Sequence, residues 1–282
     1  MWTPTTVPNS SSNTMLGATI PYLLCPSDGN VKTPVYGSPA PFLSRSNIAG
    51  NLGDTIRDLT CTYRSPYAGT ALNYLQDMVT NTRGFFGGQW RYGSFGSLAD
   101  GSSNTVAFAE RATNESRADN PSKQIKGSMA GTVTPLSTET PGNVIPAQCV
   151  AQKSPINPIE FNNAPVTYGN FGIGWAMGYY CVAGFTTVLP PNSPSCSREG
   201  GTAYWQGTMI LSASSYHTGG INIGIADGSV QFVSDTINAR TPSFAGADDP
   251  FVTGKETESG ISPYGVWGAL GSKNGGESAA AF

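Results

Sequence analysis

The chain has 282 residues, which is long enough to bury a substantial core in one or two domains. Charged residues make up 12% of it, well below the ~25% of an average soluble domain, and the formal net charge is −3. The chain also has no basic cluster, so the sequence argues against nucleic acid or an anionic membrane as a partner. The 35 glycines and 21 prolines predict many turns and few long helices.

The pattern along the chain predicts one folded unit with loose ends. Residues 1–20 are rich in Thr, Ser, Asn and Pro and predict an N-terminal arm. Residues 21–277 predict a single head domain, in which 117–165 has little pattern and is interpreted as a variable insertion. Residues 278–282 predict a frayed tail. No apolar run approaches the ~18 residues that a membrane-spanning helix needs.

Short strands dominate the predicted secondary structure, and the predicted fold class is mainly β or α+β. Residues 46–54 are small and contain glycine, which favours an extended segment closely approached by other backbone. Apolar residues recur at helical spacing within 71–80, which predicts one short helix there. Larger and small side chains alternate along 106–111, which indicates another strand.

The clearest local signal is a β-hairpin around Asp227-Gly228. These two residues suit a two-residue type I′ turn, because both tolerate positive φ. Counting outward from such a turn pairs Ile225 with Val230 and Ile223 with Phe232, and these four residues make one bulky apolar face. We expect that face to lie against a hydrophobic core. The whole of 212–237 would then form a meander, with Gly219-Gly220 reversing the chain before the hairpin.

His217 is the only histidine, and it lies nine residues before the turn. It invites pairing with Asp227 as a catalytic dyad. A reversal at the glycines would still leave the two residues ~17 Å apart along the strand. We therefore expect a structural histidine that hydrogen-bonds a backbone carbonyl.

The spacing of His217 and Asp227-Gly228 resembles the prepilin-type H-x9-DG family, a group of pseudopilin-like envelope proteins expanded in planctomycetes. Further blocks resemble the family in the same order: LLCPSD at 23–28, SNIAGNLGD at 46–54, ADGSSNTVAFAER at 99–111, TTVLPPNSPSC at 186–196 and WGALGSKNGGE at 267–277. The family motif residues, which we interpret as structural, are His217, Gly219, Gly220, Asn222, Asp227 and Gly228.

The resemblance implies a pilin-like head in the cell envelope or outside the cell. Family members normally begin with a basic leader and a long hydrophobic helix that anchors them. This chain starts beyond both, so membrane attachment is expected only through a helix absent from it. The partners implied are other pilin-like subunits or envelope proteins, as in type II secretion and type IV pilin systems.

The five cysteines show no CxxC spacing, and a charge-poor exported protein favours disulfides. Cys181 and Cys196 bracket a proline-rich loop and are the first predicted pair. Cys25 and Cys61 are the second, which leaves Cys149 as the free thiol.

Two ligand sites are weighed against plainer interpretations. Four acidic residues lie close together in this charge-poor chain and could bind calcium: Asp248, Asp249, Glu256 and Glu258. No EF-hand pattern is present, however, and acidic loops also occur without metal. Four aromatic residues could form a ligand-binding surface: Trp90, Tyr92, Trp175 and Tyr179. Aromatic residues more often pack in the hydrophobic core. No cofactor other than calcium is expected.

The function expected from these observations is non-catalytic: an envelope or surface subunit that acts through assembly or protein interaction. The first alternative is an adhesive or carbohydrate-binding module that uses the aromatic residues. The second is a hydrolase that uses His217, but no G-x-S-x-G elbow and no phosphate-binding loop is present, and Ser215 beside His217 has no supporting motif.

Overall fold

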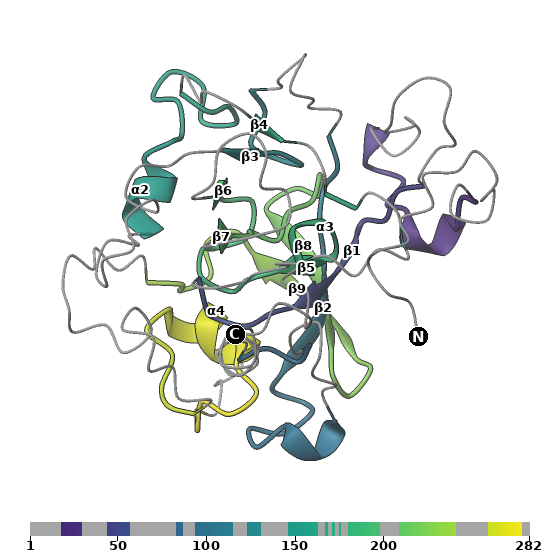
Figure 1. The fold of residues 1–282 in the computed structure, drawn as a ribbon, viewed down its shortest axis with the longest axis vertical. Helices are drawn as coiled ribbons and strands as arrows, with labels where there is room; N and C mark the ends of the chain where they lie inside the picture. Colours follow the sequence, from purple (N-terminus) through teal and green to yellow (C-terminus); the bar gives the residue numbers. More distant parts are fainter. Residues whose placement is uncertain are drawn as a thin grey trace, which may run out of the picture.

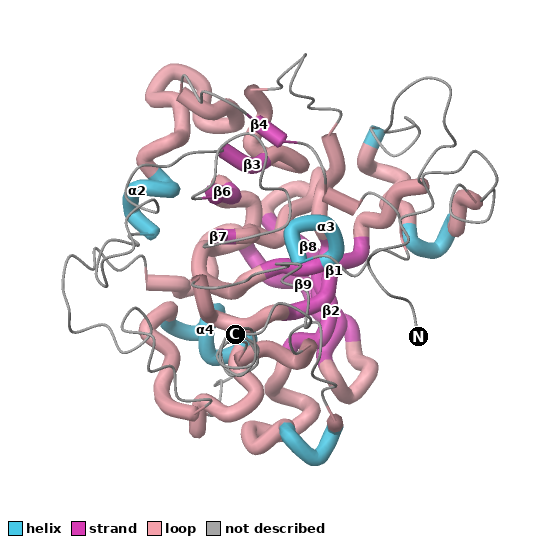
Figure 2. The backbone as a smooth tube through the Cα atoms, viewed as in Figure 1, coloured by secondary structure: helices cyan, strands magenta, loops and turns pink. Residues whose placement is uncertain are grey.

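The structure is a computed structural model. It describes residues 18–29, 44–56, 83–86, 94–114, 123–130, 146–162, 167–168, 171–172, 175, 180–197, 209–240 and 259–277. Two mixed sheets and a few short helices make up this part of the chain, so the fold is mainly β with some α, as predicted. Loops and turns make up most of the rest of the described chain (Figure 2). None of the helices in these ranges is long and apolar enough to cross a bilayer.

A five-stranded sheet lies at the centre of the molecule (Figure 1). Its strands, in spatial order, are β5 (Gly184–Phe185), β1 (Ile48–Asn51), β2 (Val106–Glu110), β8 (Gly220–Ile225) and β9 (Val230–Ser234). All neighbours run antiparallel except β1 and β5. Strands far apart in sequence therefore lie side by side, and β9 forms one edge.

A smaller four-stranded sheet lies beside the first (Figure 1). Its order is β4 (Thr167–Tyr168), β3 (Met129–Ala130), β6 (Ser195–Ser197) and β7 (Met209–Ile210). The described helices are short: η2 (Pro21–Leu23), η4 (Phe95–Ser97), α2 (Pro146–Val150), α3 (Tyr180–Ala183) and α4 (Gly265–Gly271). Part of the predicted insertion 117–165 is thus built into the fold, because it supplies β3 and α2. The helix expected over 71–80 falls outside the described residues.

Each sheet has its own hydrophobic core. Under the five-stranded sheet, Ile221, Ile223 and Val233 pack with Trp267 and Leu270 of α4, all of them at most 1% exposed. The second core lies at the four-stranded sheet and includes both cysteines of a disulfide. Burying this apolar surface is the main force that holds the loop-rich chain together.

Residues 46–54 form an extended segment closely approached by other backbone, as predicted. Gly53 has φ +93°, and a Cβ there would meet the backbone of Gly84 at 2.4 Å. The contact is held by a fully buried ion pair next to it, in which Arg83 Nε lies 2.8 Å from Asp54 Oδ1. Arg83 Nη2 also donates to Ser272 Oγ at 3.1 Å, which connects the end of β1 to the segment after α4.

The hairpin is confirmed, but its turn has three residues and not two. Ile225 N–H donates to Ser229 O, so Ala226, Asp227 and Gly228 form the loop. Gly228 has φ +92°, as expected for the left-handed residue that closes a three-residue loop. The predicted pairing of Ile223 with Phe232 is wrong, because Ile223 pairs with Gln231 and Asn222 with Phe232.

This shift of one residue places part of the hairpin on the other face. Successive side chains of a strand alternate between faces, so a slip by one inverts every side chain of β9 relative to the core. Val233 is buried at 1% exposure, whereas Val230 and Phe232 are 72% and 52% exposed. Ile223 and Ile225 are buried as predicted. The predicted four-residue apolar face is therefore half right.

The third strand of the expected meander is also different. Strand β8 pairs with β9 and with β2, while residues 212–218, which would have formed the third strand, contain an isolated parallel bridge between Ser212 and Thr186 and no strand. Strand β2 occupies the predicted range, with a bulge between Val106 and Phe108. The bulge lets Val106 and Ala109 both face the core, although strict alternation would separate them.

Replacing Val233 by alanine should cost about 2 kcal/mol of unfolding free energy, because a buried side chain is lost. Phe232→Ala should cost less than about 1 kcal/mol, although it removes more atoms, because half of that ring is in solvent. Urea unfolding of the two variants measures this. A larger loss of unfolding free energy for Phe232→Ala than for Val233→Ala would instead support the pairing expected from a two-residue turn.

The disulfide pattern differs from the prediction. Cys149 is bonded to Cys196, with their Cα atoms 5.9 Å apart. The predicted pair of Cys181 with Cys196 is therefore wrong, as is Cys149 as the free thiol. Cys181 and Cys25 are not disulfide-bonded, and Cys61 lies outside the described residues. Cys181 lies in α3, which contacts β1 and β5 of the five-stranded sheet, whereas Cys196 lies in β6 of the other sheet.

Replacing both Cys149 and Cys196 by alanine should lower the unfolding free energy by about 4 kcal/mol, because the bond closes a loop with a sequence separation of 47. Denaturant unfolding without reductant tests this, and Cys181→Ala is the matched control at another buried cysteine. Peptide mapping that finds Cys181 joined to Cys196 would contradict the assignment.

Candidate functional site

Three side chains that could bind a metal or take part in a reaction meet at the end of β2. Glu110 is the last residue of that strand, His217 lies in the turn before β8, and Cys25 follows the short helix η2. His217 Nε2 is 3.1 Å from Glu110 Oε1 and 3.7 Å from Cys25 Sγ. Glu110 and His217 are 107 residues apart in the sequence, and Cys25 and His217 are 192 residues apart.

Glu110 is held in position by strand β8. Its Oε2 accepts the backbone N–H of Asn222 at 2.8 Å, and its Oε1 accepts Asn222 Nδ2–H at 3.2 Å. The side chain of Glu110 is 14% exposed and that of His217 is 35% exposed. The carboxylate therefore has a fixed orientation while the imidazole borders solvent.

The loop that carries Cys25 is fixed by two buried polar residues, Asn47 and Asp28. Asn47 Oδ1 accepts the N–H of Cys25 at 2.8 Å, and Asn47 Nδ2 donates to Asp28 Oδ2 at 2.7 Å. The same Oδ2 atom accepts the N–H and the hydroxyl of Thr113, at 2.7 and 2.9 Å. These bonds connect the loop to the start of β1 and to the chain just after β2.

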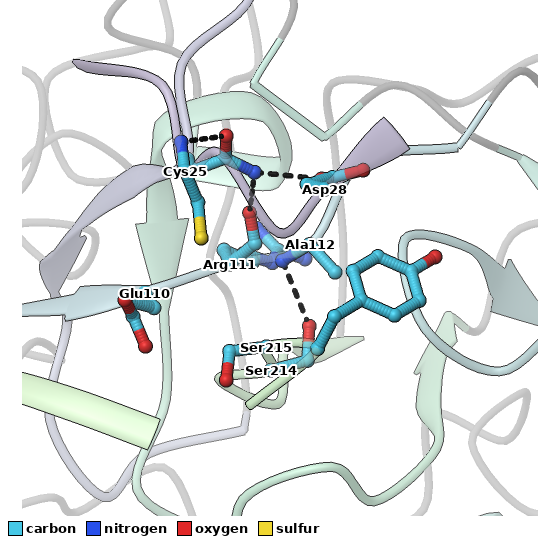
Figure 3. Close-up of a pocket in the computed structure, with 9 residues that line it drawn as sticks. Cys25, Asp28, Glu110, Arg111, Ala112, Ser214 and Ser215 are labelled. Atoms are coloured by element: carbon cyan, nitrogen blue, oxygen red, sulfur yellow. Dashed lines mark hydrogen bonds between the residues drawn. The ribbon is translucent and has the colours of Figure 1, made fainter. Parts of the chain in front are cut away.

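A small hollow adjoins the cluster and is lined by Cys25, Glu110 and Ser215 among others (Figure 3). Its empty volume is about 160 Å³, including space open to solvent. Pockets for metabolite-sized ligands usually measure ~300–1,000 Å³. The hollow is therefore too small for an organic substrate.

Arg111, which also lines the hollow, is structural. It is 2% exposed, and this burial lowers its pKa to about 9. Its guanidinium lies 3.3 Å from the centre of the Phe171 ring and donates to the carbonyls of Cys181 and Gly184. It is charged at neutral pH and anchors α3 and β5 to β2.

The arrangement around His217 differs from that of a nucleophilic triad. In such a triad the base contacts the nucleophile through one ring nitrogen and the orienting acid through the other. Here Glu110 and Cys25 both approach Nε2. Three potential ligand atoms, all within 4.8 Å of one another, instead surround a single point.

The structure places the predicted motif residues in the turn before β8, in β8 and in the hairpin loop. Gly219 has φ +80° in the turn that leads into β8. Asp227 accepts the N–H and hydroxyl of Ser229 across the hairpin loop, and these bonds lower its pKa. His217 contacts a carboxylate and not the backbone carbonyl that we expected.

Few of the other predicted ligand residues fall within the part of the chain that the structure describes. Trp175 is 37% exposed, whereas Trp90, Tyr92 and Tyr179 lie outside the described residues. The acids proposed for calcium also lie outside them: Asp248, Asp249, Glu256 and Glu258.

Cys25 and Glu110 are the site residues that sequence reasoning missed. Cys25 stands out within the LLCPSD block, but it was assigned to a disulfide with Cys61 and not to a site. Glu110 appeared only as one member of an alternating strand. Nothing local in the sequence links either residue to His217, because the contacts join separate strands and loops.

The sequence comparison identifies the family. A model of a family described as "Protein of unknown function (DUF1559)" matches residues 2–240. The chain belongs to the DUF1559 family. No curated protein and no solved structure matches it. The match includes Cys25, Glu110 and His217, so the whole cluster lies within the DUF1559 region.

Removing the Asp28 carboxylate should loosen the Cys25 loop. Asp28→Ala leaves the buried donors of Asn47 and Thr113 without this acceptor and should cost roughly 2–4 kcal/mol. Urea unfolding measures the loss, and the rate of Cys25 alkylation should rise. Asp227→Ala, at an exposed aspartate with similar bonds, is the control and should have a smaller effect. Equal losses would show that the buried bonds do not fix the loop.

Proposed function

We propose that this DUF1559 protein is a non-catalytic envelope or surface subunit that acts by assembling with other pilin-like subunits or envelope proteins. The observation that carries the proposal is the outward face of the five-stranded sheet. That face is apolar and open, whereas sheets with one solvent face usually present polar residues there.

The strand pairing identifies the residues of this outward face. Following the pairs across the sheet, one row contains Ile48, Glu110, Asn222 and Phe232, and the next contains Gly50, Phe108, Gly224 and Val230. The large apolar side chains in these rows are between 38% and 72% exposed. Exposed apolar residues that gather on one face often mark a protein interaction site.

Aromatic rings extend the outward face beyond the strands. The ring of Phe86 covers Gly50, where a Cβ would meet it at 2.8 Å. Its centre lies 5.0 Å from that of Phe108 and 4.9 Å from that of Phe85. Aromatic residues are enriched at protein interfaces, because they bury much area with little loss of conformational entropy.

Strand β9 supports the same function. It is an edge of the sheet, and within the described residues no further strand pairs with its outer side. An exposed apolar edge strand is a ready template for pairing with another chain. Assembly through β9 and the outward face together would cover Val230 and Phe232.

The test is site-specific photocross-linking in intact cells that produce the protein. A photoreactive residue at position 232 should form cross-links to envelope proteins, including further copies of this chain. The same residue at position 156 is the control, because Ile156 is 93% exposed but lies in the loop after α2. Val230→Ser together with Phe232→Ser should weaken the assembly while the fold is kept.

Cross-linking from position 232 at no more than the level of position 156 would contradict the proposal. So would a Val230→Ser, Phe232→Ser protein that assembles as well as the unchanged protein, provided that its urea unfolding is normal.

A further inference from the structure

The cluster of Cys25, Glu110 and His217 offers one sulfur, one nitrogen and one oxygen to a common point. The measured separations are 3.7 Å between Cys25 Sγ and His217 Nε2, and 3.1 Å between His217 Nε2 and Glu110 Oε1. All three donor atoms lie within 4.8 Å of one another. This is the one such group of three among the parts of the chain that the structure describes.

These separations match the edges of a metal coordination tetrahedron. With a Zn–S bond of about 2.3 Å and Zn–N and Zn–O bonds of about 2.0–2.1 Å, a tetrahedral site keeps sulfur and nitrogen about 3.6 Å apart and nitrogen and oxygen about 3.3 Å apart. The two observed edges are close to these values. The third edge, between sulfur and oxygen, is at most 4.8 Å.

The donor types select the metal. Calcium and magnesium prefer ligands that are all oxygen. A thiolate with an imidazole and a carboxylate is a mixed set that suits zinc.

Neighbouring residues hold the three donors in place. Asn222 donates to both oxygens of Glu110, and Asn47 accepts the N–H of Cys25. Ser215 Oγ accepts the N–H of His217 at 3.1 Å. Hydrogen bonds of this kind orient ligands in metal sites and reduce the cost of arranging them when the ion binds.

We propose that Cys25, Glu110 and His217 bind a zinc ion, with the fourth position open to solvent. The open position follows from exposure, since the imidazole is 35% exposed. The site lies on the outward face of the sheet, because Glu110 stands in the same row as Ile48 and Asn222. It does not depend on whether that face assembles with other subunits.

The test uses the purified full chain after dialysis against a chelator. Zinc should bind with a stoichiometry of one in calorimetry and should raise the melting temperature, whereas calcium should do neither. Cobalt(II) in place of zinc should give the absorption of a tetrahedral site with a sulfur-to-cobalt charge-transfer band.

Single substitutions assign the ligands. Cys25→Ser should abolish the charge-transfer band, and His217→Gln and Glu110→Gln should each weaken zinc binding by more than ~100-fold, beyond the usual effect of losing a supporting hydrogen bond. Cys181→Ala and Glu160→Gln are matched controls outside the cluster and should bind zinc normally. Urea unfolding of each metal-free variant shows that it is folded.

Three results would overturn the proposal. One is a folded wild-type chain that binds no zinc at one equivalent and gives no charge-transfer band. Another is zinc binding that survives unchanged in Cys25→Ser or His217→Gln. The third is recovery of Cys25 in a disulfide from the native protein, because its sulfur could then not bind the metal.

Discussion

The candidate site depends on the buried carboxylate of Asp28. A single oxygen of this side chain accepts hydrogen bonds from Asn47 and twice from Thr113, so the loop of Cys25 is fixed to two strands at once. A charged acceptor makes such bonds stronger than neutral ones, and burial makes their loss expensive. Without these hydrogen bonds, nothing else in the local sequence of this proline- and glycine-containing loop would hold the Cys25 thiol beside His217.

The two faces of the five-stranded sheet have different tasks. The inner face is filled by Ile221, Ile223 and Val233 against Trp267 of α4, and this packing provides the stability. The outer face carries Phe108 and Phe232 in the open, together with the Glu110 cluster. Apolar faces of this kind are often covered by another surface during function, which is why we propose that this one serves assembly.

Membership of the DUF1559 family places the chain in a group of unknown function, so the chemistry has to come from the site itself. The cluster and the outward face are adjacent but separable. Glu110 belongs to both, since its strand position puts it on the outer face and its carboxylate contacts His217. A metal at this point would stiffen the junction of β2 and β8 without altering the apolar rows beside it.

The sequence by itself determined the local features. The Asp227-Gly228 turn, the strand at 106–110, the close approach at Gly53 and the β-rich class follow from residues near one another in the chain, whose conformational preferences act locally. Only the tertiary structure decided the rest. Loop length set the register that exposed Phe232, and sheet topology paired Cys149 with Cys196. The meeting of Cys25, Glu110 and His217 needed three distant segments to pack together, and no local preference encodes such long-range contacts.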